Sequence, residues 1–336
     1  MGNVTINKPT TANNMFAPFA PSRAVDSVIS AANRWVSSEV PAYLQVDLQG
    51  LCWINQYTAN FMGSVNWPSN YNLSDFKVQS SMDGSNWTDI ETFTGNTANQ
   101  LNRTVTPRQA KFLRVYITKG LTCNNGVASI VDFQAFEPAN APFLSNLVPS
   151  TGTLSPVFST RALNYSMNVA NTVNTIKFTP TALNGGTIKV NGTAVTSGQQ
   201  STDITLNVGS NLVPVEVTSS DNTMKTTYNI TVVRAGVAAF LSALSLRTDR
   251  NQPVAYTPAL SDSVLSYSAS VGSGVAAIIV TPSASNATIL VNGTQVTSGG
   301  DSPKITLVSG ANSISIQVSP SGGGSTTNYT LIVTKG

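Results

Sequence analysis

Hydrophobic and polar residues alternate in short runs along the chain, and helical periodicity is nearly absent. Residues 44–48, 112–117 and 313–318 show the alternation, and Gly, Asn, Ser and Pro bound such runs. A period of two places successive side chains on opposite faces of a strand. Many short strands separated by turn residues are typical of β-sandwiches, so the predicted fold class is all-β.

The second part of the chain contains an internal repeat. The segment Val-Asn-Gly-Thr-Ala-Val-Thr-Ser-Gly at 190–198 recurs at 291–299 with Gln in place of Ala. Tyr228 and Tyr329 have the same offset of 101 residues. Asn-Gly readily takes positive φ at both central positions of a two-residue turn, so each copy predicts a tight hairpin.

Two similar domains are therefore predicted, at 143–235 and 240–336, after a different domain at 1–138. A length of 336 residues suits two or three domains, each with its own core. Residues 138–142, Pro-Ala-Asn-Ala-Pro, predict a short stiff linker because proline restricts its own φ and its neighbour's. Residues 235–239 form a second brief junction, and short junctions predict a semi-rigid rod.

Charge is sparse: 10% of the residues are charged and 41% are hydrophobic, against about 25% charged in soluble domains. The 18 Lys and Arg residues are scattered, whereas a nucleic-acid binder concentrates them on one face. No apolar run is long enough for membrane insertion. The first residues lack the pattern of a signal peptide. We therefore expect neither nucleic acid nor a membrane interior as partner.

The residues also argue against an enzyme. The chain has no histidine, its 15 acidic residues are dispersed, and it contains neither a nucleophile elbow nor a phosphate loop. The absence of histidine and of a CxxC motif argues against a zinc site. Cys52 and Cys123 either form one disulfide or remain two small apolar residues.

Residues 24–137 resemble the discoidin, or coagulation factor 5/8 type C, family, which includes the family-32 carbohydrate-binding modules. The motifs are Tyr-Leu-Gln-Val-Asp-Leu at 43–48, Ser-Met-Asp-Gly-Ser-Asn-Trp at 81–87 and Phe-Leu-Arg-Val at 112–115. Gln49 stands where this family usually has Gly. The resemblance implies an N-terminal jelly-roll β-sandwich of galactose-binding type, with Trp35 and Trp87 as core anchors or ligand platforms.

The two repeats resemble bacterial cadherin-like β-sandwich domains. The shared features are Leu-Ser near the start, Val-Asn-Gly in the middle, a Gly-x-Asn segment and a terminal Tyr-x-Ile-x-Val or similar run. The resemblance implies two tandem Ig/cadherin-like sandwiches, which in that family serve as spacers or adhesion modules.

The factor 5/8 resemblance also implies a structural calcium ion. Asp26 and Glu137 match the family's ligand positions, and Asn33, two residues before Trp35, replaces the usual Thr. Calcium accepts carboxylate, amide and carbonyl oxygens alike. The alternative is that Asp26 only caps a turn and Glu137 is solvated.

Candidate ligand-binding residues gather in a polar loop at 63–72. Sugar binding needs an aromatic face and a few fixed polar groups, and this loop supplies both. The predicted set is Trp67, Tyr71, Asn66, Asn70, Asn72, Arg103, Asn124 and Asn125. The alternative is that Trp67 and Tyr71 fold over the end of the sandwich and close its core. Phe16 and Phe19 form another aromatic pair expected to be exposed.

These features favour a non-catalytic, extracellular or cell-surface protein that binds a glycan or cell-surface polysaccharide and serves in adhesion. A second hypothesis is a phage virion structural or decoration protein, with a host-surface-binding head on the virion surface and capsid or tail proteins, or copies of itself, as partners. A third is an accessory fragment of a secreted glycoside hydrolase.

Overall fold

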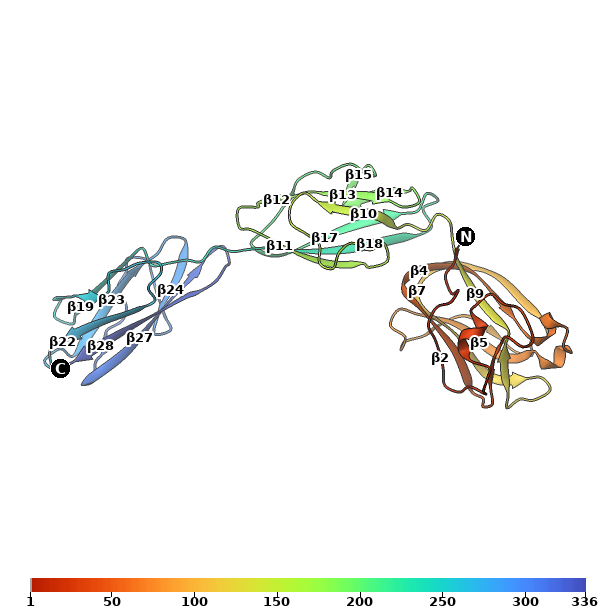
Figure 1. Ribbon diagram of the computed structural model, residues 1–336. Coiled ribbons are helices and arrows are strands. Elements are labelled where there is room, and N and C mark those ends of the chain that lie inside the picture. The colour runs from red at the N-terminus through yellow and green to blue at the C-terminus, as the bar shows by residue number, and fades with distance from the viewer. Residues whose placement is uncertain (1) are drawn as a thin grey trace.

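The computed structural model describes residues 2–336, and its strands form three bodies in a row (Figure 1). We call them the head (2–138), the middle sandwich (143–235) and the terminal sandwich (240–336). Each is organised around its own cluster of buried hydrophobic residues. The described helices are the single 3-10 turns Pro21–Ala24, Met62–Val65 and Ser69–Tyr71, labelled η1, η2 and η3. The all-β prediction is confirmed. In residues 2–336 no helix has the length and apolar character needed to cross a membrane.

Two long antiparallel strands, β4 (Ala42–Asn60) and β7 (Gln100–Leu121), run through the head. Register shifts between Asp47 and Cys52, and between Ile54 and Gln56, interrupt their pairing, and such bulges bend a strand. β4 therefore pairs with β2 over its first half and with β9 over its second. The order of strands in this sheet is β1-β9-β4-β7-β5-β6, with β2 beside β4. The remaining strands of the sheet are β1 (Gly2–Asn3), β2 (Thr10–Ala12), β5 (Leu73–Ser81), β6 (Thr88–Phe93) and β9 (Asp132–Glu137). A separate two-stranded sheet pairs β3 (Trp35–Ser37) with β8 (Ala128–Ile130).

Alternation in β4 fills the head's core. Leu44, Val46 and Leu48 are buried and the residues between them are only partly so, as a two-residue period requires. Trp35 is fully buried, which confirms it as a core anchor. Trp87 is only partly buried, and the Arg114 guanidinium lies 4.2 Å from its ring centre.

The middle and terminal sandwiches share one plan, in which two layers of strands enclose a core. In each, one strand joins the last strand in parallel: β11 (Asn164–Val169) with β18 (Lys225–Arg234), and β22 (Ser266–Val271) with β28 (Thr327–Lys335).

The remaining strands complete these layers. In the middle sandwich the sheet order is β11-β18-β17-β14-β15, with pairs β10–β13 and β12–β16; the bounds are β10 (Leu144–Pro149), β12 (Thr175–Ile176), β13 (Phe178–Ala182), β14 (Thr187–Val190), β15 (Thr193–Val195), β16 (Ile204–Thr205) and β17 (Gly209–Thr218). In the terminal sandwich the orders are β21-β22-β28-β27-β24-β25 and β20-β19-β23-β26; the bounds are β19 (Ala243–Thr248), β20 (Pro253–Val254), β21 (Tyr256–Thr257), β23 (Ala277–Ser283), β24 (Ala287–Val291), β25 (Thr294–Val296), β26 (Ile305–Thr306) and β27 (Gly310–Pro320).

The repeated residues hold equivalent positions in the two sandwiches. Each Asn-Gly pair has positive φ at both residues and closes a hairpin, β14–β15 or β24–β25, as predicted. The hydroxyl oxygen of Tyr228 accepts the Leu144 N–H at 3.0 Å, and that of Tyr329 accepts the Leu241 N–H at 3.0 Å. These buried phenols tie the last strand of each sandwich to its first segment.

A packed joint connects the head to the middle sandwich. Leu51 and Trp53 of β4 belong to the middle sandwich's core, and Trp53 Nε1 donates to Thr226 Oγ1 at 2.9 Å. Arg161 Nη2 lies 2.7 Å from Glu137 Oε2. The predicted short linker at 138–142 is therefore accompanied by direct contact between the two bodies.

The disulfide considered for the two cysteines is not formed. Cys52 is buried beside Arg161 at the joint, whereas Cys123 is exposed on a loop. Burial raises the pKa of the Cys52 thiol to about 11, although the Arg161 charge opposes the shift. Cys52 therefore behaves as a small buried group of the interface.

Candidate functional site

Loops from three parts of the sequence meet at the end of the head away from the joint. β9 runs from Asp132 at this end to Glu137 at the joint. The Cys123 N–H donates to the Asn70 carbonyl at 2.7 Å, and the Phe61 N–H donates to the Asn99 carbonyl at 2.9 Å. Segments 61–72, 97–99 and 120–125 thus form one surface, which we call the tip.

Backbone geometry holds the tip loops in place. Asn66 ends η2 in the left-handed region at φ 66°, a conformation that Asn tolerates better than most residues. A Cβ atom on Gly120 would lie 2.1 Å from the Val127 carbonyl oxygen, so only glycine fits there without movement of the loop. Glycine at this position therefore lets residues 120–127 pack closely on themselves at the end of β7.

Trp67 and Tyr71 form the aromatic centre of the tip. Their ring centres are 5.0 Å apart with planes at 86°, an edge-to-face pair. Trp67 is 40% exposed, whereas Tyr71 is half-buried against the head's core. Of the two roles predicted for this pair, Tyr71 therefore takes that of closing the core, where it also supports Trp67. Trp67 faces solvent and remains the candidate ligand platform.

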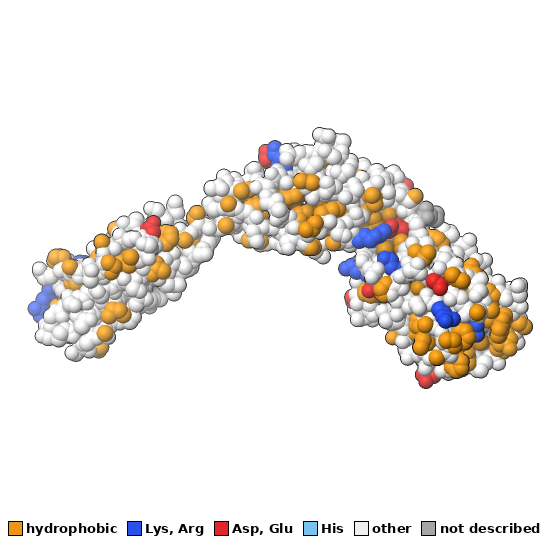
Figure 2. Space-filling model, viewed as in Figure 1, with side chains coloured by type: hydrophobic (Ala, Val, Ile, Leu, Met, Phe, Trp, Pro, Cys, Tyr) orange, Lys and Arg blue, Asp and Glu red, His pale blue; other side chains and the backbone are white. Residues whose placement is uncertain are grey.

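Arg34 lies behind this pair, and nothing in the sequence pattern pointed to it. Its guanidinium carbon is 5.7 Å from the Trp67 ring centre and 4.0 Å from that of Phe19, which is cation–π geometry. Burial lowers the Arg34 pKa from its ordinary value. Phe16 is exposed, as expected, and hydrophobic side chains gather at this end of the head (Figure 2). Phe19 instead packs against Arg34.

The polar residues predicted for the site divide into two groups. Asn66, Asn70, Asn124 and Asn125 are exposed on the tip loops. The prediction that Asn72 binds a ligand is wrong, because this residue is fully buried. Its Oδ1 accepts the Gly63 N–H at 2.8 Å, and its Nδ2 donates to Asn99 Oδ1 at 2.8 Å. Asn72 therefore supports the loop from inside and presents no group to a ligand.

The prediction that Arg103 binds a ligand is also wrong. It lies on β7, where its Nη2 donates to Glu91 Oε1 at 2.5 Å, and this pairing raises its pKa. Its charge is satisfied within the sheet.

The residues predicted to hold calcium are only partly brought together. Asn33 Nδ2 lies among four oxygens, at 2.8 and 3.0 Å from the two Asp26 carboxylate oxygens, 3.1 Å from the Arg23 carbonyl and 3.0 Å from the Val28 carbonyl. Asp26 also accepts the Val28 N–H at 2.9 Å, which closes a turn.

Glu137 does not join Asp26 and Asn33, and the expectation that it does is wrong. It lies at the opposite end of β9, where it pairs with Arg161 and accepts the Trp53 N–H at 2.9 Å. Asp132, at the near end of β9, is the second carboxylate beside the Asp26 loop; it accepts the Ser27 N–H at 3.2 Å, and burial raises its pKa. Within residues 2–336 no three His, Cys, Asp or Glu side chains cluster as a metal site.

Family comparisons agree with this architecture. The model of the F5/8 type C domain matches residues 7–133, and that of the cadherin-like beta sandwich domain matches residues 144–235 and 241–336. The second model covers more than half of the chain. The protein therefore belongs to the cadherin-like beta sandwich family, and it carries an F5/8 type C domain as its head. Both resemblances drawn from the sequence are confirmed.

Individual similar proteins match one part of the chain. Chitosan-binding module 1 of a chitosanase/glucanase from Paenibacillus sp. IK-5 is 27% identical, with 40% of this chain and 99% of the module covered and a TM-score of 0.34. A family 32 carbohydrate-binding module of EndoD from Streptococcus pneumoniae is 18% identical, with 41% and 100% covered and a TM-score of 0.34. A putative membrane protein from Evansella cellulosilytica is 34% identical over 95 residues, and the chain spans 14% of its length.

Proposed function

We propose that the head binds a carbohydrate reversibly at the tip and performs no chemistry on it. The observation that supports this is the exposed Trp67 ring, held edge-on to Tyr71 with four exposed asparagines on the adjoining loops. The C–H face of a sugar ring packs on an aromatic face. Asn side chains both donate and accept hydrogen bonds, which suits sugar hydroxyls.

The tip is preorganised for such a ligand. Tyr71 and Arg34 fix the Trp67 ring, and the buried Asn72 fixes the loop that carries it. A side chain that is already ordered loses little conformational entropy on binding. The site has one exposed platform, so single-site affinity is weak and useful attachment needs several heads or several sugars at once.

The two cadherin-like sandwiches suit the role of a stalk. They extend away from the joint, and the tip lies at the opposite end of the head (Figure 1). A glycan or cell-surface polysaccharide at the tip would then be held at a distance from whatever carries the terminal sandwich. We propose an extracellular or cell-surface adhesion role on this basis.

Calcium is proposed as a structural ion of the Asp26 loop. The two Asp26 carboxylate oxygens and the Arg23 and Val28 carbonyls converge on one point, and oxygens of these kinds are calcium ligands. Asn33 Nδ2 occupies that point here, so its side chain would turn aside and present Oδ1. The ion would join the Asp26 loop to the start of β3 and would leave Glu137 in the joint.

The test compares Trp67→Ala with Trp87→Ala in the full chain. Both remove an indole, but Trp87 lies outside the tip beneath Arg114. A glycan array that includes chitotriose and Lewis B finds a binder, and isothermal titration measures its Kd; thermal unfolding checks that both variants fold. We expect Trp67→Ala to weaken binding about tenfold or more, which is ~1.4 kcal/mol, and Trp87→Ala to bind as the parent does. Absence of any saccharide ligand, or equal binding by Trp67→Ala, overturns the proposal.

A further inference from the structure

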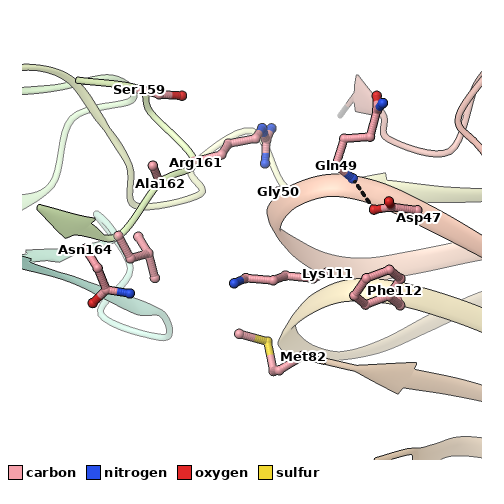
Figure 3. Close-up of a pocket in the computed structure, with 11 residues that line it drawn as sticks. Asp47, Gln49, Gly50, Met82, Lys111, Phe112, Ser159, Arg161, Ala162 and Asn164 are labelled. Atoms are coloured by element: carbon pink, nitrogen blue, oxygen red, sulfur yellow. Dashed lines mark hydrogen bonds between the residues drawn. The ribbon is translucent and has the colours of Figure 1, made fainter. Parts of the chain in front are cut away.

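A cavity lies between the head and the middle sandwich, beside the joint. Its volume is about 670 Å³, which falls in the range of small-molecule sites of ~300–1,000 Å³. Figure 3 shows its two walls. Asp47, Gln49, Lys111 and Phe112 line it from the head, and Ser159 and Asn164 line it from the middle sandwich. We call it the interdomain cleft.

The joint sets the width of the interdomain cleft. Arg161 reaches across it and donates to the Leu51 carbonyl at 2.6 Å and to Glu137 at 2.7 Å. A Cβ atom on Gly50 would lie 3.0 Å from the Arg161 Cβ, so the Gly50 backbone lies directly against the Arg161 side chain. Because Glu137 pairs with the guanidinium, the Arg161 charge is neutralised within the joint.

Two opposite charges remain unpaired on the walls. Among residues 2–336, neither Asp47 nor Lys111 takes part in an ion pair. Asp47 accepts the Gln49 N–H at 2.8 Å, and the Lys111 ammonium projects into the gap (Figure 3). Charged side chains of both signs gather at this junction on a surface that is otherwise weakly charged (Figure 2).

These charges select the kind of ligand. An ammonium only donates hydrogen bonds and a carboxylate only accepts them. A simple anion would be repelled by Asp47 and a simple cation by Lys111. A hydroxyl group donates to one and accepts from the other, so a neutral ligand rich in hydroxyls satisfies both. Ser159 and Asn164 add groups that both donate and accept hydrogen bonds.

The interdomain cleft also has an apolar surface. Phe112 and the exposed Met82 lie on the head wall. A Cβ atom on Gly84 would lie 3.5 Å from the Phe112 ring, so the turn at Gly84 backs the ring. A backed aromatic ring beside unpaired polar groups is the combination that binds a sugar ring.

Gln49 shapes the head wall through its backbone. It adopts φ 61°, in the left-handed region that favours glycine, at a cost of roughly 1–2 kcal/mol for other residues. The chain therefore turns sharply between Asp47 and Gly50, which line the same wall. The Gln49 side chain points away from the gap (Figure 3), and its Oε1 accepts Lys8 Nζ at 3.2 Å.

We propose that the interdomain cleft is a second saccharide site, which takes a short neutral oligosaccharide. Asp47 accepts hydrogen bonds from its hydroxyls, Lys111 donates hydrogen bonds to its oxygens, and Phe112 faces its C–H groups. The proposal does not depend on the tip, because it stands on separate residues from both domains. A chain with both sites would hold one polysaccharide, or two neighbouring ones, bivalently.

The test uses the full chain carrying Trp67→Ala, so that the tip cannot contribute. Neutral gluco-, galacto- and manno-trisaccharides are titrated while the backbone amide signals of Gln49 and Phe112 are followed by NMR. We expect one of them to shift both signals. Lys111→Gln should then weaken binding about tenfold, whereas the matched control Lys119→Gln, an exposed lysine on the same strand, should leave it unchanged.

Three results would overturn this inference. The first is that no neutral trisaccharide shifts the Gln49 and Phe112 signals. The second is equal affinity for the two lysine variants. The third is tighter binding of trigalacturonate, which would assign the interdomain cleft to anions. None of them bears on the tip, which is tested by Trp67→Ala in the chain with Lys111 intact.

Discussion

Glu137 and Arg161 join two different domains, with 2.7 Å between Oε2 and Nη2. The Glu137 side chain is 13% exposed and that of Arg161 34%, so the pair is largely shielded from water. The last strand of the head thus ends in a contact with the middle sandwich. The glutamate that the family resemblance assigned to calcium instead pairs with an arginine of the next domain.

The Glu137–Arg161 pair should contribute measurably to stability. A double-mutant cycle with Glu137→Gln and Arg161→Met in the full chain should give a coupling free energy of unfolding of about 1–2 kcal/mol. The pair Lys177–Asp203 serves as control, because its N–O distance is longer, at 3.5 Å, and its carboxylate is 59% exposed; it should give close to zero. Urea unfolding measures both cycles, and equal coupling in the two would contradict a special role for the joint.

The hydrogen bond between Trp53 and Thr226 should stabilise the same joint. Thr226 is fully buried, and Thr226→Val keeps its shape but leaves the indole N–H without an acceptor. We expect a loss of about 1–3 kcal/mol in the free energy of unfolding. Thr226→Ser restores the hydroxyl and should recover part of that loss. If the serine and valine variants are equally unstable, packing rather than the hydrogen bond is responsible.

Calcium should raise the unfolding temperature of the chain relative to EDTA, since an ion bound only by the folded state stabilises it. Asp26→Ala should abolish this increase because it removes both carboxylate oxygens. Glu137→Gln should retain it, because Glu137 lies at the other end of β9. Differential scanning fluorimetry compares the three proteins. No calcium effect on the parent chain would contradict the proposed ion.

Asp83 should give the head an acid-sensitive component of stability. Its carboxylate accepts the Asn86 N–H at 2.8 Å, the Asn86 side-chain amide at 2.7 Å and the Ser85 N–H at 2.9 Å, and these bonds lower its pKa. Because the folded pKa lies below the unfolded value of about 3.9, the contribution is present above pH 4 and is lost as pH falls below it.

Thermal unfolding between pH 5 and pH 2 measures this effect. Asp83→Asn retains an acceptor oxygen but cannot titrate, so its unfolding temperature should fall less than that of the parent over this range. Asp203→Asn, at an exposed position, is the control. Parallel pH profiles for the parent and Asp83→Asn would exclude a role for this carboxylate.

Sequence reasoning was least successful where a residue's partner comes from another part of the chain. Arg34 lies against Trp67, 33 positions away, and Arg161 lies against Glu137 in another domain. Asn72 is indistinguishable in sequence from its exposed neighbours Asn66 and Asn70, because the same loop carries all three. Burial of one asparagine among several depends on how the loop folds back on Gly63 and Asn99.

The sequence alone determined the all-β class, the repeat and its Asn-Gly hairpins. These follow from local rules, since residue alternation sets which face a side chain takes and turn chemistry sets φ. Tertiary structure alone decided the parallel pairing of β11 with β18, the separation of Cys52 from Cys123, the position of Glu137 and the existence of the interdomain cleft. Each of these depends on how sheets close and domains pack, which joins residues whose separation in the chain carries no local pattern.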